Sequence, residues 1–259
     1  MSTAPASQSV LLDVADGIAT ITLNRPEQFN TIGIESMRQL AAVIAEVEND
    51  ASVKVAILRG AGRTFSGGGD IKSMHEHLDD MPRFIGEIVD YFHAAILALR
   101  RLKIPVIAAV HGSAAGGGFS LALACDVVIA TDTARFVTAY PKLATSTDGG
   151  LSFFLTKRLG TKGALDILLL HDLISAQDAL ALGLITRVVP ADQLEAEAKT
   201  LAQRLTGLPA QSVREIKQLV SGLHDGELAA QLAAERAAFL RCCAEAEFGE
   251  RVVAFLTKK

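Results

Sequence analysis

The chain has 259 residues, of which half are hydrophobic, with 25 Lys and Arg against 29 Asp and Glu. The resulting net charge of −4 does not provide the positive surface that nucleic-acid binding requires, and the apolar content is too high for a largely disordered chain. A chain of this length buries about 70–75% of the surface that it exposes when unfolded, so its core needs neither disulfides nor metal ions.

The cysteines and the apolar segments indicate where such a chain works. The three cysteines, Cys125, Cys242 and Cys243, are an odd number and form no Cys-x-x-Cys pair, which argues against a disulfide framework and against a zinc site. The first residues lack the basic and apolar regions of a secretory signal. No apolar run approaches the roughly 20 residues that span a bilayer. We therefore expect a cytoplasmic protein that binds no metal, no membrane and no nucleic acid.

Short strands alternate with helices in the first part of the chain. Runs of β-branched and apolar residues predict strands over residues 10–14, 18–23, 53–58, 104–110, 127–130 and 185–189. Asp16-Gly17 supplies the turn between the first two strands. Apolar residues at helical spacing predict helices from Met37 to Asn49, from Phe84 to Leu102 and from Phe119 to Ala124.

Beyond Gly149 nearly all of the pattern is helical. Helical spacing covers residues 150–160, 161–170, 176–182, 191–206, 210–221 and 227–247. The alternation of strands and helices before this point is typical of an α/β core. We predict that core over residues 1–190 and a helical C-terminal region over residues 191–259.

Two glycine-rich loops each follow a predicted strand and open a predicted helix. They are Ser66-Gly67-Gly68-Gly69-Asp70 and Ala114-Ala115-Gly116-Gly117-Gly118. Glycine tolerates positive φ and lets a ligand approach the free N–H groups at a helix N-terminus. Taken singly, each loop fits a tight strand-to-helix turn. Taken together, two N–H groups that converge on one point can form an oxyanion hole. Asp70 is also expected to cap the helix that begins at Ile71.

Four segments resemble motifs of the crotonase superfamily, the enoyl-CoA hydratase/isomerase family. They are Leu23–Asn30 (LNRPEQFN), Phe65–Ile71 (FSGGGDI), Ile104–Gly112 (IPVIAAVHG) and Ala115–Asp126 (AGGGFSLALACD). The resemblance implies an α/β spiral of ββα units with a C-terminal helical trimerisation region, assembled as a homotrimer or a dimer of trimers. It also implies an acyl-CoA substrate, no cofactor beyond that coenzyme A thioester, and the N–H groups of Gly69 and Gly117 as oxyanion donors.

The resemblance also shows that two catalytic carboxylates are absent. Hydratases of the family use two glutamates to activate and orient water, and their positions fall on Ser120 and Tyr140. Neither a hydroxyl nor a phenol serves as a carboxylate base at neutral pH. The segment Leu143–Leu151 is similar to the Ser-Pro-Asp-Gly-Gly segment of the family's isomerases, with Thr147 in place of the proline. The resemblance therefore makes Asp148 the candidate base, although this aspartate could instead only cap a helix that begins at the next residue.

Further residues are expected to bind the substrate. By the same resemblance, Arg25 and Phe29 contact the nucleotide of coenzyme A. Lys258 and Lys259 either reach its 3′-phosphate or are the default case of a charged, frayed terminus. The first glycine-rich loop and the residue after it contribute the other expected contacts, Ser66, Gly67, Gly68, Asp70 and Ile71.

Two substituted positions and one helical segment leave alternatives open. Ser120 either hydrogen-bonds a substrate oxygen or bonds to the backbone. Tyr140 either lines the substrate pocket or packs within a strand. The segment from Met74 to Ile88 either forms the wall of an acyl pocket, as the resemblance implies, or is ordinary core.

These features together predict an acyl-CoA isomerase of the Δ3-Δ2-enoyl-CoA or epoxyphenylacetyl-CoA type. Gly69 and Gly117 would stabilise a thioester enolate, and Asp148 would shuttle the proton. One alternative is an enoyl-CoA hydratase with an atypical way of activating water. The other is a non-catalytic member of the family that binds acyl-CoA.

Overall fold

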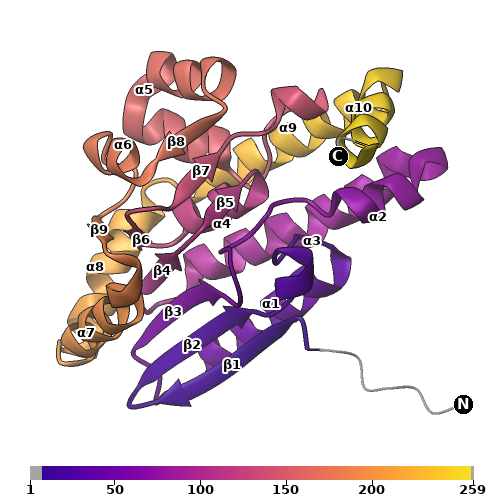
Figure 1. Cartoon of the computed structure of the whole chain (residues 1–259). Coiled ribbons are helices and arrows are strands. Elements are labelled where there is room, and N and C mark those ends of the chain that lie inside the picture. The colour runs from indigo at the N-terminus through magenta and orange to yellow at the C-terminus, as the bar shows by residue number, and fades with distance from the viewer. Residues whose placement is uncertain (1–7, 258–259) are drawn as a thin grey trace, which may run out of the picture.

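The computed structural model describes residues 8–257, and its larger sheet contains six strands (Figure 1). Their bounds are β1 Val10–Ala15, β2 Ile18–Leu23, β3 Val55–Gly60, β4 Val106–Val110, β6 Val127–Thr131 and β9 Arg187–Val189. The order across the sheet is β1-β2-β3-β4-β6-β9, in which β1 runs antiparallel to β2 and every other neighbouring pair is parallel. All six predicted strands are therefore confirmed, with small differences at their ends.

A second, smaller sheet was not predicted from the sequence. It consists of β5 Ser113–Ala115, β7 Arg135–Val137 and β8 Leu173–Ser175, in the order β5-β7-β8. Each of these strands has three residues, which is too short to show the two-residue alternation that marks a strand. Because β5 includes the first two residues of the second glycine-rich loop, Ala114 and Ala115, this sheet helps to fix where that loop lies.

Helices cover both faces of the larger sheet and continue to the C-terminus. Their bounds are α1 Ile34–Asn49, α2 Ile71–Glu76, α3 Met81–Arg101, α4 Gly117–Ala124, α5 Leu151–Leu170, α6 Ala176–Ala181, α7 Leu194–Thr206, α8 Ala210–Gly222, α9 Asp225–Cys243 and α10 Ala246–Thr257. Within residues 8–257, none of these helices combines the length and the apolar character that crossing a membrane requires.

The predicted helix over residues 227–247 is wrong, because two helices occupy this part of the chain. α9 ends at Cys243 and α10 begins at Ala246. The turn between them brings the buried Phe248 ring to 6.3 Å from the Phe239 ring, in an edge-to-face arrangement. A single straight helix could not bury both rings in one contact. By contrast, Gly160 breaks α5 at φ 70°, at the predicted boundary between residues 160 and 161.

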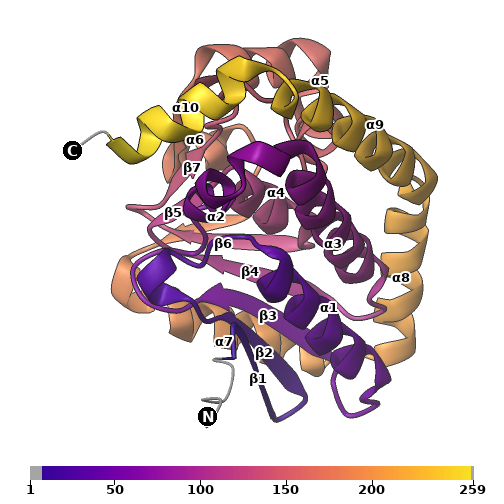
Figure 2. The ribbon, with the colours of Figure 1, turned by 90° about the vertical axis from the view of Figure 1, so that its right-hand side faces the viewer.

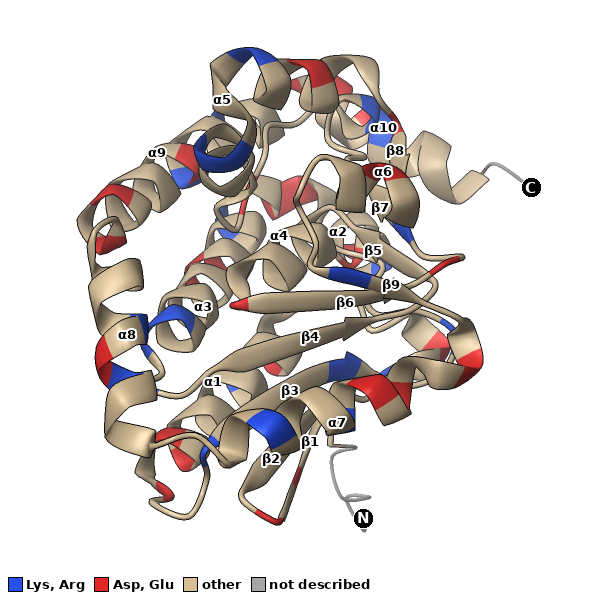
Figure 3. Cartoon of the chain, turned by 90° about the vertical axis from the view of Figure 1, so that its left-hand side faces the viewer, with Lys and Arg blue, Asp and Glu red and all other residues tan. Residues whose placement is uncertain are grey.

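The two faces of the sheet carry separate clusters of buried side chains. Leu58 faces the cluster that includes α1 and α3, whereas its neighbour Ile57 faces the cluster that includes α7. Figures 2 and 3 show α1 and α3 on one side of the sheet and α7 on the other. Since α7 begins after residue 190 and completes this second cluster, part of the predicted C-terminal region packs on the core. The boundary at residue 190 itself stays a prediction.

A buried lysine ties α8 to the end of the sheet. Lys217 Nζ donates to Asp126 Oδ2 at 2.6 Å and to the Ile104 carbonyl at 2.7 Å. The same Asp126 oxygen accepts the Val106 N–H at 2.8 Å. Burial lowers the pKa of Lys217, and Asp126 opposes that change by favouring the charged ammonium. Removal of either partner alone takes a counter-charge away from the other and destabilises the fold.

We expect Lys217→Met to reduce the free energy of unfolding by about 2–4 kcal/mol, because it removes the buried cation that pairs with the Asp126 carboxylate. Urea denaturation at one fixed protein concentration measures this loss. Lys142→Met is the matched control, since Lys142 pairs with Asp172 on the exposed surface and should change the free energy by less than about 1 kcal/mol. Equal effects of the two substitutions would contradict the argument.

Candidate active site

The two glycine-rich loops lie side by side, joined by backbone hydrogen bonds. The Ala115 N–H donates to the Ser66 carbonyl at 2.9 Å, and the Ser66 N–H donates to the Ser113 carbonyl at 3.1 Å. An added Cβ at Gly68 would lie 2.5 Å from the Ala115 carbonyl oxygen, and one at Gly118 would lie 2.7 Å from Ser66 Cβ. Glycine is therefore required at both positions for the loops to approach this closely.

A cavity of about 200 Å³ opens at the junction of the two loops. Gly69 and Gly117, one from each loop, line it. Gly117 is the first residue of α4, where backbone N–H groups have no partner within the helix. Within residues 8–257, neither the Gly69 N–H nor the Gly117 N–H donates a hydrogen bond. Both donors are thus available to a ligand in the cavity.

Apolar side chains form most of the cavity wall. They come from α2, α3, α9 and α10 and include Ile71, Met74, Ile85, Ile88, Val89, Phe239 and Phe255. Met74, Ile85 and Ile88 also belong to the buried core. Both interpretations of the segment from Met74 to Ile88 therefore hold, because the same residues are core and cavity wall.

Asp148 is the one carboxylate among the described residues that line the cavity. Tyr140, which also lines it, donates its hydroxyl hydrogen to Asp148 Oδ1 at 2.7 Å. Burial raises the pKa of Asp148 to about 7, the Tyr140 hydrogen bond opposes this rise, and the charge of Glu235 adds to it. Burial also raises the pKa of Tyr140, so the phenol stays protonated and acts as the donor. Asp148 Oδ2 accepts no hydrogen bond from residues 8–257.

The turn that carries Asp148 is held by side chains from distant helices. Gly149 and Gly150 have φ values of 62° and 84°, which glycine adopts without strain. The Gly149 N–H donates to His93 Nε2 of α3 at 3.1 Å. Burial lowers the pKa of His93 to about 4, so the ring is neutral and this nitrogen can accept. The Gly150 N–H donates to Glu235 Oε2 of α9 at 2.7 Å.

The alternative in which Asp148 only caps a helix is wrong. α5 begins at Leu151, and no Asp148 side-chain atom accepts from its first turn. The Ser152 N–H instead donates to Glu235 Oε1 at 3.1 Å. The helix N-terminus is thus satisfied by another carboxylate, which leaves Asp148 facing the cavity.

Ser120 and Tyr140 hold different places, although resemblance puts both at positions of missing glutamates. Ser120 is fully buried, and its hydroxyl donates to the Asp148 carbonyl at 2.8 Å. The alternative in which Ser120 bonds to the backbone is therefore confirmed. Tyr140 lines the cavity, as one of its two alternatives predicted.

The first glycine-rich loop contributes both cavity-lining and supporting residues. Gly67, Gly68 and Ile71 line the cavity together with Gly69. Ser66 is buried and donates to the Asn30 carbonyl at 2.8 Å. Asp70 accepts the Ser73 N–H at 3.2 Å, so the predicted cap of α2 is confirmed.

Arg25 and Phe29 lie outside the cavity, next to this loop. Arg25 pairs with Asp70 at 3.2 Å. Phe29 is exposed, and the Arg63 guanidinium lies 5.6 Å from the centre of its ring. Their expected contact with coenzyme A stays a prediction. Lys258 and Lys259 lie outside the described residues.

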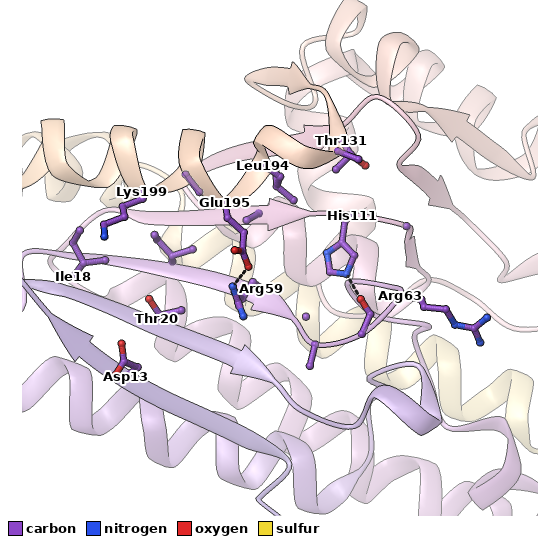
Figure 4. A pocket seen from close by; sticks show the side chains of 18 of the residues that line it. Asp13, Ile18, Thr20, Arg59, Arg63, His111, Thr131, Leu194, Glu195 and Lys199 are labelled. Carbon is purple, nitrogen blue, oxygen red and sulfur yellow. Dashed lines mark hydrogen bonds and ion pairs between the residues drawn. The ribbon is translucent and has the colours of Figure 1, made fainter.

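A larger cavity of about 800 Å³ lies where α7 passes over the sheet (Figure 4). Arg59 and Glu195 form an ion pair there, and His111 Nε2 lies 3.0 Å from the Gly62 carbonyl. None of the predicted site residues lines this cavity. The predicted chemistry therefore belongs to the smaller cavity between the glycine-rich loops and Asp148.

Glu235 and His93 were not predicted from the sequence. They hydrogen-bond the Asp148 turn from 85 and 56 residues away along the chain. One signal was present for Glu235. It occupies the apolar stripe of α9 formed by Leu228, Leu232 and Phe239, and a charged residue on such a stripe needs a buried partner. Position 93 carried no comparable signal.

Comparisons with known proteins identify the family of the chain. The profile of the enoyl-CoA hydratase/isomerase family matches residues 13–259. The chain is 39% identical to the probable enoyl-CoA hydratase EchA12 of Mycobacterium tuberculosis, over 84% of this chain and 79% of that protein. It is 36% identical to the 1,2-epoxyphenylacetyl-CoA isomerase of Escherichia coli K12, over 96% of each protein.

A solved structure extends this similarity to the fold. The enoyl-CoA hydratase from Mycobacterium avium subsp. paratuberculosis matches with a TM-score of 0.87 and 32% identity, covering 97% of this chain and 100% of that one. The crotonase-like α/β fold is therefore confirmed. Proteins named as hydratases and as isomerases both resemble the chain, so these names alone do not select the reaction. The chain belongs to the enoyl-CoA hydratase/isomerase family.

Proposed function

We propose that the protein is an acyl-CoA isomerase that uses Asp148 as a single base. The observation that carries this proposal is the pairing, around one apolar cavity, of two unengaged backbone donors with one carboxylate. The similarity to an isomerase of epoxyphenylacetyl-CoA supports it. The reaction needs no cofactor beyond the coenzyme A thioester of the substrate.

In the proposed reaction the thioester carbonyl oxygen accepts hydrogen bonds from the N–H groups of Gly69 and Gly117. Asp148 Oδ2 removes a proton from the acyl chain, and the electron pair moves into the carbonyl to form an enolate. The two N–H groups stabilise that negative charge, which is worth about 10²–10³ in rate for each donor. Asp148 then returns the proton to another carbon, so no atom is gained or lost.

The pKa of Asp148 suits this double role. A group that must both take and give a proton works best when its pKa is near the operating pH. Burial brings the pKa of Asp148 to about 7, so both protonation states are populated in neutral solution. The Tyr140 hydroxyl supports the ionised state by donating to Oδ1.

The hydratase alternative has fewer groups to work with. Addition of water needs one group that activates the water and a route for the proton to the substrate carbon. Ser120 is buried and donates to the Asp148 carbonyl, and the raised pKa of Tyr140 keeps the phenol neutral. Both steps would therefore fall on Asp148 alone. The names of the hydratase relatives are what favours this alternative.

The size of the cavity supports a small acyl group. The cavity has about 200 Å³ of space between largely apolar walls. A short 3-enoyl chain or a single ring fits this space. Phe255, exposed on α10, lies at the rim of the cavity.

We further propose that the chain assembles as a homotrimer or a dimer of trimers in the cytoplasm. α8 exposes a row of apolar side chains, Ile216, Leu219, Val220 and Leu223, of which Leu219 and Leu223 are 72% and 74% exposed. α5 adds Leu169 and Leu170. Apolar surface of this kind is costly in water and is normally covered by another chain.

We expect Asp148→Asn to lower the turnover of 3-enoyl-CoA or epoxyphenylacetyl-CoA by about 10²–10⁴-fold, because the amide cannot accept the proton. Uptake of solvent deuterium at the acyl carbons should fall equally. Asp172→Asn, at an exposed ion pair, is the control and should keep wild-type rates. Rapid hydration of crotonyl-CoA without isomerisation would favour the hydratase, and absence of both turnover and exchange would favour a non-catalytic acyl-CoA binder.

The pH dependence of kcat/KM should report Asp148. Its carboxylate is the active base, and its pKa of about 7 means that this form is lost as the pH falls through 7. We therefore expect kcat/KM to rise tenfold per pH unit below about pH 7 and to level off above it. A rate that stays constant down to about pH 5 would mean that the base has an ordinary carboxyl pKa.

Leu219→Glu should weaken the proposed assembly, since it places a charge in the apolar row of α8. Analytical ultracentrifugation should give three or six times the 27.3 kDa chain mass for the wild type and smaller species for the variant. Leu11→Glu, on the apolar surface of β1, is the control. A wild-type protein that sediments as a single chain would rule out the assembly.

A further inference from the structure

Glu235 is a buried carboxylate that no cation neutralises within the described residues. Its residue is 4% exposed, and no salt bridge there includes it. Four hydrogen bonds take the place of an ion pair. The Gly150 N–H donates to Oε2, while the Ser152 N–H, the Ser152 hydroxyl and the Thr147 hydroxyl donate to Oε1.

The donors come from both sides of Asp148. Thr147 precedes it, and its hydroxyl lies 3.2 Å from Glu235 Oε1. Gly150 follows Asp148 by two residues, and its N–H donates to Glu235 Oε2 at 2.7 Å. The Glu235 side chain therefore accepts hydrogen bonds from the residues on both sides of the proposed base. Glu235 lies on α9, which packs against both α3 and α5, as Figure 2 shows. These helix contacts hold the Glu235 side chain in place.

The chemistry of the donors requires a carboxylate at this position. Two of the four are backbone N–H groups, and each oxygen of Glu235 accepts one of them. A glutamine would have to turn its NH₂ group toward one of these N–H groups, because an amide has a single acceptor atom. An ionised carboxylate accepts on both oxygens, so these hydrogen bonds favour the charged form, whereas burial opposes it and raises the pKa of Glu235.

That retained charge also acts on Asp148. The Glu235 charge contributes to the raised pKa of Asp148, after the larger effect of burial. The other titratable groups around Asp148 are the Tyr140 phenol, which donates to it, and the Cys243 thiol of α9, whose own pKa is raised mainly by burial. On α3, His93 is neutral, and beyond it Asp90 pairs with Arg236. Glu235 is the remaining anion of this group.

We propose that Glu235 is a positioning residue for the base Asp148: it fixes the turn on both sides of this aspartate and places a second negative charge near its carboxylate. This inference rests on the proposed isomerisation, because it assigns Glu235 a part in that reaction. Glu235 does not line the cavity and acts only through Asp148.

The test combines three substitutions on α9 with two readouts. Glu235→Gln removes the charge and should move the acid limb of kcat/KM to lower pH, because a nearby like charge no longer disfavours the ionised base. Glu235→Asp keeps the charge but shortens the reach, so kcat should fall about tenfold while the limb stays in place. Glu227→Gln is the matched control, since it removes an exposed carboxylate of the same helix and should change neither quantity.

The second readout does not depend on activity. In protein labelled with ¹³C at the aspartate carboxyl carbons, the Asp148 resonance is identified by its loss in Asp148→Asn and titrated by NMR. Its midpoint should fall in Glu235→Gln by the same amount as the acid limb. An unchanged midpoint in folded Glu235→Gln protein overturns the proposal, whether or not the wild type isomerises a thioester. Failure of the proposed function would instead appear as a wild-type protein without exchange.

A milder substitution covers the case in which Glu235→Gln does not fold. Thr147→Val removes one donor to the Glu235 carboxylate and changes no charge. We expect kcat to fall about tenfold with KM and the acid limb unchanged. A kcat equal to that of the wild type would show that the hydrogen bond between Thr147 and Glu235 has no effect on the reaction.

Discussion

The backbone pairing between Ser66 and the strand before the second glycine-rich loop is the constraint on which the site depends. β3 and β4 are neighbouring parallel strands, so the chain leaves both at the same edge of the sheet. The hydrogen bonds between Ser66 and residues 113 and 115 continue this pairing beyond the sheet. They bring the N-termini of α2 and α4 to one cavity. Side chains at Gly68 or Gly118 would force the loops apart, and Gly69 and Gly117 would no longer line the same cavity.

Near Asp148, one carboxylate caps the helix and another faces the cavity. An aspartate that capped α5 would accept several backbone N–H groups, and these bonds together with the helix dipole would lower its pKa. Glu235 performs that task instead. Asp148 is left with one hydrogen bond from Tyr140 in an apolar cavity, so burial can raise its pKa. The charge of Glu235 adds to the larger effect of burial on the pKa of Asp148, the proposed base.

How much of this could be predicted depends on the distance along the chain over which each contact acts. The α/β alternation, the two glycine-rich loops and the Asp70 cap are local patterns, and they were predicted correctly. Asp148 was named as the candidate base through the resemblance of its segment to family isomerases, because an aspartate before two glycines does not by itself indicate a catalytic role. The interactions of His93 and Glu235 with the Asp148 turn join segments far apart in the sequence, and no periodicity within one helix reports such a contact. The strands of the smaller sheet were too short for their pattern to be seen.

The residues at the two positions of the family's glutamates, Ser120 and Tyr140, both hydrogen-bond Asp148. The resemblance places water-activating glutamates there, yet each residue present now serves Asp148. Ser120 holds its carbonyl, and Tyr140 donates to its carboxylate. Where the resemblance places two carboxylates, the chain has two hydroxyl groups that hydrogen-bond Asp148, the proposed base. For the proposed isomerisation, one carboxylate in this cavity is sufficient, because the same group can take the proton from one carbon and return it to another.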